Sequence, residues 1–140
     1  MIVVDASVLA PALADDGPDG DQARARLSGE ALAAPELIDL EVSSVFRRLQ
    51  SSGQLPARRA ELALTDLVAL PLRRVSHRNL LPRCWELRDN LTIYDAAYVA
   101  LAEVLGLTLV TADARAATAP GLRCDIEILA RRPGRDEPAR

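Results

Sequence analysis

Short apolar runs alternate along the chain with longer segments in which apolar residues recur every three or four positions. The short runs have the length of buried strands and lie at residues 2–4, 31–34, 72–75, 107–111 and 126–130. The longer segments predict helices over 8–14, 22–28, 36–52, 56–70, 77–89 and 93–105, with a loop or short helix over 113–118. Strands that alternate with helices predict an α/β fold with a mainly parallel sheet.

Proline, glycine and serine refine the expected boundaries. The stretch 15–21, which is rich in Asp, Gly and Pro, is expected to separate the first two helices. Pro35 suits the first turn of the following helix, and the apolar run before it is expected to be an edge strand. Ser76 is expected to cap a single helix over 77–89, with Pro82 in its first turns.

The composition is that of one globular domain. The 140 residues are 49% hydrophobic and only 3% aromatic, so the core must consist mainly of Ala, Leu and Val. We expect a single domain over residues 1–130 and a disordered tail over 131–140. Met1 runs directly into an apolar strand, so neither a signal peptide nor a membrane span is expected. Cys84 and Cys124 form no CxxC pair, which favours buried thiols in a reducing cytoplasm.

The basic residues exclude several kinds of chemistry. All seventeen are arginine, and the absence of lysine removes Walker-type nucleotide binding and Schiff-base catalysis. His77 is the only histidine, which disfavours a catalytic triad. The formal net charge of −3 argues against broad electrostatic wrapping of nucleic acid but allows a local site rich in carboxylates. The remaining chemistry depends on carboxylates, hydroxyls, arginines or a bound metal.

Two acids follow apolar runs at the ends of predicted strands. Asp5 ends the run IVVD, and Asp113 follows the run TLVTA. In doubly wound sheets, ligands bind beyond the carboxyl ends of the strands, so both acids would face one crevice if these strands are neighbours. The alternative for each is that the aspartate merely caps the turn or helix after it.

Two further acids lie on predicted helices. Glu41 falls on the apolar stripe of its helix, where an unpaired carboxylate is costly and needs either a metal or an internal ion pair with an arginine. Asp95 stands three residues after Thr92, which is the spacing of a capping box, but the same placement points a carboxylate from the start of an apolar helix towards a crevice.

The four acids together favour a metal site. Carboxylates that crowd one another take up protons unless a cation holds them. Oxygen ligands without histidine or thiolate suit Mg²⁺ or Mn²⁺ rather than Zn²⁺. Such a cation lowers the pKa of an attacking water and stabilises the leaving oxygen during phosphodiester cleavage.

Three segments of the chain resemble the PIN domains of VapC-type toxins. They are the opening IVVDASVL, the helix that carries Glu41, and the run TIYDAAYVALAEVLGLTLVTAD. The resemblance extends from residue 1 to about residue 130, and the stretch around Asp95 is its most specific part. It implies a three-layer fold with strand order 3-2-1-4-5 and an acidic Mg²⁺ or Mn²⁺ site that hydrolyses RNA.

The resemblance also implies roles for individual residues. Asp5, Glu41, Asp95 and Asp113 match the catalytic, metal-holding acids of the family, with Asp5 and Asp113 as direct ligands and the other two as ligands directly or through water. Ser7 and Thr111 match small hydroxyl residues that orient the site. Arg115 and Tyr94 lie beside these positions and are candidate RNA contacts. After Asp113 the sequence reads ARAA where relatives often have another acid or an aromatic, which leaves open whether one or two metals act.

The sequence therefore predicts a cytoplasmic Mg²⁺- or Mn²⁺-dependent endoribonuclease that is the toxin of a type II toxin–antitoxin pair. The resemblance implies a homodimer and a cognate VapB-like antitoxin that masks the site. One alternative is a PIN-fold binding module that lacks productive metal chemistry and acts through a protein partner. A phosphatase with Asp5 as nucleophile is a second alternative, which the absence of lysine and of a DxD pattern disfavours.

Overall fold

Five short strands form one parallel sheet in the order β3-β2-β1-β4-β5. The computed structural model describes residues 1–131 of the chain. The strands are β1 (Ile2–Val4), β2 (Leu32–Pro35), β3 (Leu72–Val75), β4 (Leu109–Thr111) and β5 (Ile126–Ile128). Val3 of β1 lies opposite Ala33 on one side and Leu109 on the other. The α/β fold and the expected strand order are thus confirmed, and the order reverses between β1 and β4, where doubly wound sheets bind their ligands.

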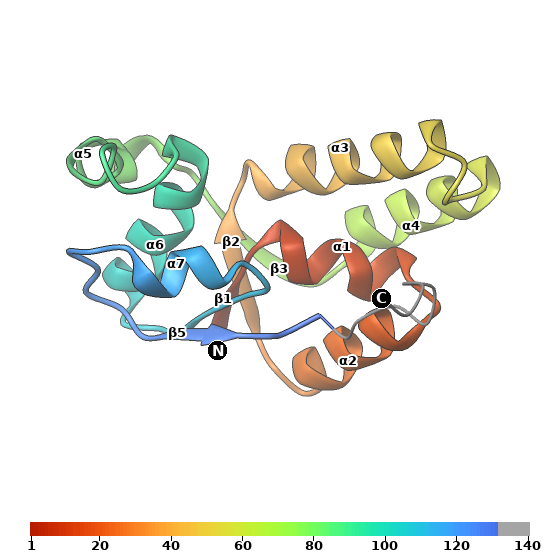
Figure 1. Cartoon of the computed structure of the whole chain (residues 1–140), viewed down its shortest axis with the longest axis horizontal. Helices are drawn as coiled ribbons and strands as arrows, with labels where there is room; N and C mark the ends of the chain where they lie inside the picture. Colours follow the sequence, from red (N-terminus) through yellow and green to blue (C-terminus); the bar gives the residue numbers. More distant parts are fainter. Residues whose placement is uncertain (132–140) are drawn as a thin grey trace, which may run out of the picture.

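Helices cover both faces of this sheet (Figure 1). They are α1 (Ala6–Ala14), α2 (Pro18–Leu27), α3 (Ile38–Ser51), α4 (Ala57–Ala69), the 3₁₀ helix η1 (Arg78–Leu80), α5 (Leu81–Glu86), α6 (Ile93–Leu105) and α7 (Ala114–Thr118). In Figure 1, α1 to α4 lie on one side of β1, and α5 to α7 lie on the other. Helix α6 packs on β1, β2 and β4, while α1 packs against α2, α3 and α4. Of the helices in residues 1–131, none has the length and apolar character needed to cross a membrane.

Strand β1 and helix α6 are buried most completely within the core. Ile2, Val3 and Val4 are all buried, as expected for a central strand covered on both faces. Residues 96–102 of α6 are also all buried, which explains why this helix is apolar around its whole circumference. Gly106 ends α6 in a left-handed conformation with φ of 64°, which costs a glycine little.

The positions expected for two prolines relative to the helices and strands were wrong. Pro35 is the last residue of β2 rather than the start of a helix, and Glu36 continues the pairing by donating its N–H to the carbonyl of Val75 at 2.9 Å. Strand β2 is also an interior strand between β3 and β1, not an edge strand. Pro18 begins α2 four residues before the expected start, because the first turn of a helix does not need the N–H that proline lacks.

The helix expected over 77–89 is two shorter helices. The 3₁₀ helix η1 ends at Leu80, and α5 begins at Leu81 with Pro82 in its first turn. Because proline has no N–H to donate and its ring crowds the preceding turn, one continuous α-helix is disfavoured here. The tail expected over 131–140 lies outside the described residues, apart from Arg131.

Candidate active site

Asp5 and Asp113 lie at the carboxyl ends of neighbouring strands. Asp5 follows β1 directly, and Asp113 follows β4 by two residues. Because Val4 lies opposite Val110 in the parallel pairing, both acids emerge at the same edge of the sheet. Each side chain also accepts a hydrogen bond at the start of a helix, Asp5 at α1 and Asp113 at α7. Both acids therefore cap a helix and also lie at one edge of the sheet, so the two readings weighed from the sequence are compatible.

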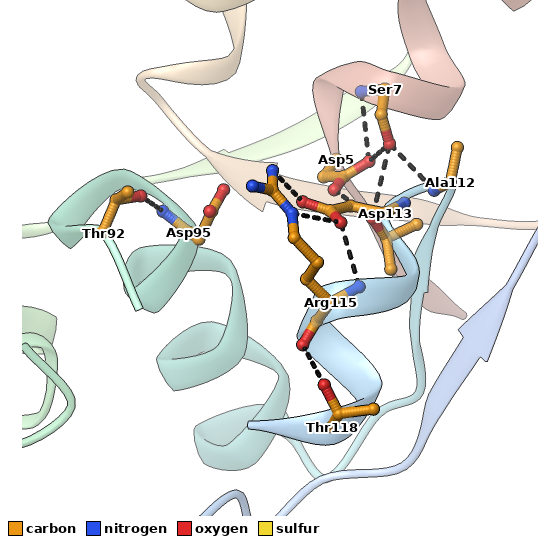
Figure 2. Close-up of polar contacts among 9 residues, drawn as sticks. Asp5, Ser7, Thr92, Asp95, Ala112, Asp113, Arg115 and Thr118 are labelled. Atoms are coloured by element: carbon orange, nitrogen blue, oxygen red, sulfur yellow. Dashed lines mark hydrogen bonds and ion pairs between the residues drawn. The ribbon is translucent and has the colours of Figure 1, made fainter. Parts of the chain in front are cut away.

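A network of hydroxyl groups holds Asp5 (Figure 2). Asp5 Oδ1 accepts hydrogen bonds from the backbone N–H and the hydroxyl of Ser7, at 3.1 and 2.5 Å. Thr111, which is 1% exposed, donates its hydroxyl to Asp5 Oδ2 at 2.5 Å. The network joins β1 to the segment after β4, because Ala112 N–H donates to Ser7 Oγ and Asp113 N–H donates to Thr111 Oγ1. Ser7 and Thr111 thus lie where the resemblance places residues that orient the site.

Glu41 reaches the same region from the first turn of α3. It is half-buried, and its Oε1 accepts a hydrogen bond from the hydroxyl of Tyr98 at 2.7 Å. Its side chain pairs with no arginine in residues 1–131, so the internal ion pair weighed from the sequence is wrong for this part of the chain.

Asp95 lies in the first turn of α6. Its backbone N–H donates to Thr92 Oγ1 at 3.1 Å, which confirms that Thr92 caps this helix. The half-buried carboxylate of Asp95 makes no hydrogen bond or ion pair with any other side chain that the structure describes. The cap therefore uses the backbone of Asp95 and leaves its carboxylate available.

The charges of Asp5, Glu41 and Asp95 act on one another. Burial raises the pKa of Asp5, against the hydrogen bonds from Ser7 and Thr111, and the negative charge of Asp95 raises it further. Burial also raises the pKa of Glu41, and the charges of Asp95 and Asp5 add to the effect. The fold thus brings three acids from three separate elements close enough to repel one another.

Asp113 is paired with an arginine. Arg115 donates to the Asp113 carboxylate through its backbone N–H at 3.0 Å, through Nε at 3.1 Å and through Nη2 at 3.0 Å. This guanidinium lowers the pKa of Asp113, and in Figure 2 it lies between the carboxylates of Asp113 and Asp95. The Arg115 side chain is 90% exposed, and exposed ion pairs contribute little to stability, so this pair is easily opened.

The two tyrosines of α6 differ in position. Tyr94 is 65% exposed in the first turn, where it is accessible to a partner. Tyr98 is 2% exposed and lies among the buried apolar residues of α6. Its contact with Glu41 was missed, although the spacing of three residues from Asp95 places both side chains on one face of the helix.

The carboxylate oxygens of this region are suitable ligands for a hard divalent cation, but they are not arranged around one point. Carboxylate oxygens that repel one another are the ligands that Mg²⁺ and Mn²⁺ prefer. No group of three or more His, Cys, Asp or Glu side chains within residues 1–131 is already arranged to hold a metal ion. The hydroxyl network and Arg115 engage oxygens of Asp5 and Asp113 instead. A cation that used Asp113 as a ligand would have to displace the Arg115 side chain.

Comparison with known proteins identifies the family. The model of the PIN domain matches residues 2–122. The chain is a PIN-domain protein. Ribonuclease VapC9 of Mycobacterium tuberculosis is 43% identical over 131 residues, which are 94% of this chain and 100% of that protein. Ribonuclease VapC1 of the same organism is 41% identical over 128 residues, which are 91% of this chain and 96% of the relative. The chain thus belongs with the VapC members of the PIN-domain family.

Solved PIN-domain structures show the same fold. VapC20 of Mycobacterium tuberculosis, a toxin that cleaves the sarcin-ricin loop, superposes with a TM-score of 0.66 at 16% identity, covering 84% of this chain and 94% of that one. The VapBC2 complex of Rickettsia felis, bound to a DNA fragment from its promoter, gives 0.66 at 16% identity, covering 91% of this chain and 98% of the other. At such low identity these structures establish the fold alone.

Proposed function

We propose that this PIN-domain protein is a metal-dependent endoribonuclease and the toxin of a type II toxin–antitoxin pair in the cytoplasm. Asp5, Glu41, Asp95 and Asp113 would together hold Mg²⁺ or Mn²⁺ at the edge of the sheet. The observation that carries the proposal is that Asp5, Asp95 and Asp113 lie in one region at the edge of the sheet where the strand order reverses (Figure 2). Relatives named as ribonucleases over nearly the whole chain support it.

Different residues of the chain would have different roles in phosphodiester cleavage. The bound cation would supply an activated water and would stabilise negative charge on the leaving oxygen. Ser7 and Thr111 hold the Asp5 carboxylate from both sides, so its orientation is set before substrate arrives. Asp95 contributes a carboxylate that no other side chain in residues 1–131 engages. Arg115 would transfer its hydrogen bonds from Asp113 to an RNA phosphate, and exposed Tyr94 would stack on a base.

Cleavage of RNA tests the enzyme directly. The wild-type protein with Mn²⁺ or Mg²⁺ is expected to shorten RNA, and a chelator is expected to stop it. Asp5→Asn should abolish cleavage while the fold is retained. Asp66→Asn, which changes an exposed acid on α4, is the matched control and should cleave normally. Full cleavage by folded Asp5→Asn, or in the presence of the chelator, would overturn the proposal.

The ion pair of Asp113 with Arg115 favours a second candidate function. If Arg115 holds Asp113 permanently, the protein is a PIN-fold binding module that acts through a partner without metal chemistry. Calorimetric titration with Mn²⁺ separates the two functions, because such a module would bind no Mn²⁺ and the nuclease would.

A groove beside the site supports the proposed antitoxin partner. It has a volume of about 630 Å³ and shares Ser7 with the acidic site. Its walls combine apolar side chains of α1 and α3 with charged ones, including Ala10, Ala14, Val45, Leu49, Arg48 and Asp16. A VapB-like segment lying in it would cover the entrance to Asp5. Co-expression with the product of the neighbouring reading frame should yield a complex without nuclease activity. For the chain alone, light scattering should give the mass of a homodimer. A separate, active monomer would contradict both expectations.

A further inference from the structure

Tyr98 links the core of the protein to the acidic site. It lies on α6, one turn after Asp95, and is 2% exposed. Its hydroxyl donates to Glu41 Oε1 at 2.7 Å. This is the one hydrogen bond that either side chain makes within the described part of the chain. One side-chain hydrogen bond therefore joins α3 to α6 beside the acidic site.

Core packing alone does not explain a tyrosine at this position. The neighbouring α6 residues 96, 97 and 99–102 are all buried and all apolar, and a phenylalanine ring would fill the same space. A buried hydroxyl is costly unless it finds a partner. Here the partner is a carboxylate, which accepts the hydrogen bond that the phenol donates. The hydroxyl is thus specific to Glu41.

Glu41 needs such a contact to keep one orientation. Its side chain has several rotatable bonds, and ordering it has an entropic cost. The negative charges of Asp5 and Asp95 favour orientations that point away from them. The bond from Tyr98 occupies Oε1, and Oε2 makes no hydrogen bond within the described residues. Asp5 is held in a comparable way by the hydroxyls of Ser7 and Thr111.

We infer that Tyr98 is a positioning residue: its buried hydroxyl fixes the Glu41 carboxylate and so sets the orientation in which Glu41 would meet a cation. The inference rests on the proposed function. Residues that hold a metal ligand in place typically change metal affinity about 10-fold to 100-fold when they are replaced. Tyr98 would therefore act on the cation through Glu41 and not by direct contact.

A double-mutant cycle with Mn²⁺ tests the inference. Calorimetric titration compares the wild type with Tyr98→Phe, Glu41→Gln and the double variant. Tyr98→Phe should bind Mn²⁺ about 10-fold more weakly. The same change in the Glu41→Gln background should have no further effect, since the two residues act as one unit. Phe46→Leu, a change at a buried aromatic on α3, controls for general loss of core packing and should leave the Mn²⁺ affinity unchanged.

A wild-type measurement keeps the test valid if Tyr98→Phe does not fold. Tyr94 and Tyr98 are the two tyrosines of the chain, so ¹³C labelling at Cζ alone gives one signal for each. Titration with Mg²⁺ should shift the Tyr98 signal in step with binding.

Each outcome decides the matter. Weaker Mn²⁺ binding that disappears in the Glu41→Gln background supports the inference. If the wild type binds Mn²⁺ and Tyr98→Phe binds it equally tightly, the inference is wrong and the proposed nuclease stands. The same holds if Mg²⁺ does not shift the Tyr98 signal. A wild-type protein that binds no Mn²⁺ overturns both.

Discussion

Replacing Asp5 by asparagine should cost little stability in the metal-free protein and should remove the stabilisation that Mn²⁺ gives to the wild type. In the metal-free protein the replacement is well tolerated, because asparagine keeps one oxygen to accept both hydrogen bonds from Ser7. At the Oδ2 position the new amide would donate to Thr111 Oγ1, whose hydroxyl needs only to rotate. The variant also avoids burying a charge beside Asp95.

The expected magnitudes follow from these contacts. A hydrogen bond to a charged group is stronger than a neutral one by about 1 kcal/mol, so weakening the bonds from Ser7 and Thr111 costs about 2 kcal/mol. Relief of the buried charge offsets part of this, and the metal-free variant should melt within about 6 °C of the wild type. Mn²⁺ at about 100 times its Kd should stabilise the wild type by about 2.7 kcal/mol, or about 8 °C, and the variant hardly at all.

The dependence of the melting temperature on pH tests the same substitution independently. The pKa of Asp5 is raised in the folded state, so the stability associated with its protonated form is complete below the ordinary value of 3.8 and is lost as pH rises through the raised pKa. Asparagine does not titrate. Without metal, the melting temperature of the variant should therefore rise relative to that of the wild type as the pH increases from acidic to neutral.

Differential scanning calorimetry with a chelator, and then with Mn²⁺, measures both effects. Circular dichroism of the variant at room temperature controls for folding. An Asp5→Asn protein that gains as much from Mn²⁺ as the wild type would show that Asp5 holds no cation. If the melting temperature of the metal-free variant instead falls relative to that of the metal-free wild type as pH rises, the fold stabilises the Asp5 charge.

Three further predictions concern other parts of the chain. Arg115→Gln should strengthen Mn²⁺ binding by a factor of a few in calorimetry, because Asp113 loses its competing ion pair; unchanged or weaker binding would contradict this competition. Thr92→Ala should lower the free energy of unfolding by about 1 kcal/mol in urea, through loss of the α6 cap; an unchanged midpoint would show that the cap contributes nothing. Gly20→Ala places a Cβ 1.7 Å from the backbone oxygen of Asp15 and should cost about 1–3 kcal/mol, whereas a rise in melting temperature would refute this steric argument.

Hydrophobic periodicity predicted the main elements of the fold. The helix over residues 93–105 was predicted to the residue, because an apolar run between Thr92 and Gly106 has clear start and stop signals. The errors fall at prolines, whose single missing N–H is compatible with the end of β2 at Pro35 and with the start of α2 at Pro18. Local sequence does not distinguish these positions, and for Pro35 the pairing of β2 with β3 decides the outcome.

The candidate site was predictable to the extent that its residues follow recognisable patterns. Asp5 and Asp113 follow apolar strands, and the expectation that these strands are neighbours was correct. The contact between Tyr98 and Glu41 joins residues 57 positions apart, and a buried tyrosine in an apolar helix resembles any core residue. Arg115 was predicted as a candidate RNA contact, and its pairing with Asp113 emerges only when the turn into α7 is formed.

The position of a bound cation is the central question. Crystals of the protein soaked with MnCl₂ and measured at a wavelength sensitive to manganese would reveal it in an anomalous difference map. We predict a peak within about 2.3 Å of carboxylate oxygens of Asp5 and at least one of Glu41, Asp95 and Asp113, with the Arg115 side chain turned away from the site. A map at saturating Mn²⁺ with no peak among these acids would contradict the proposed metal site.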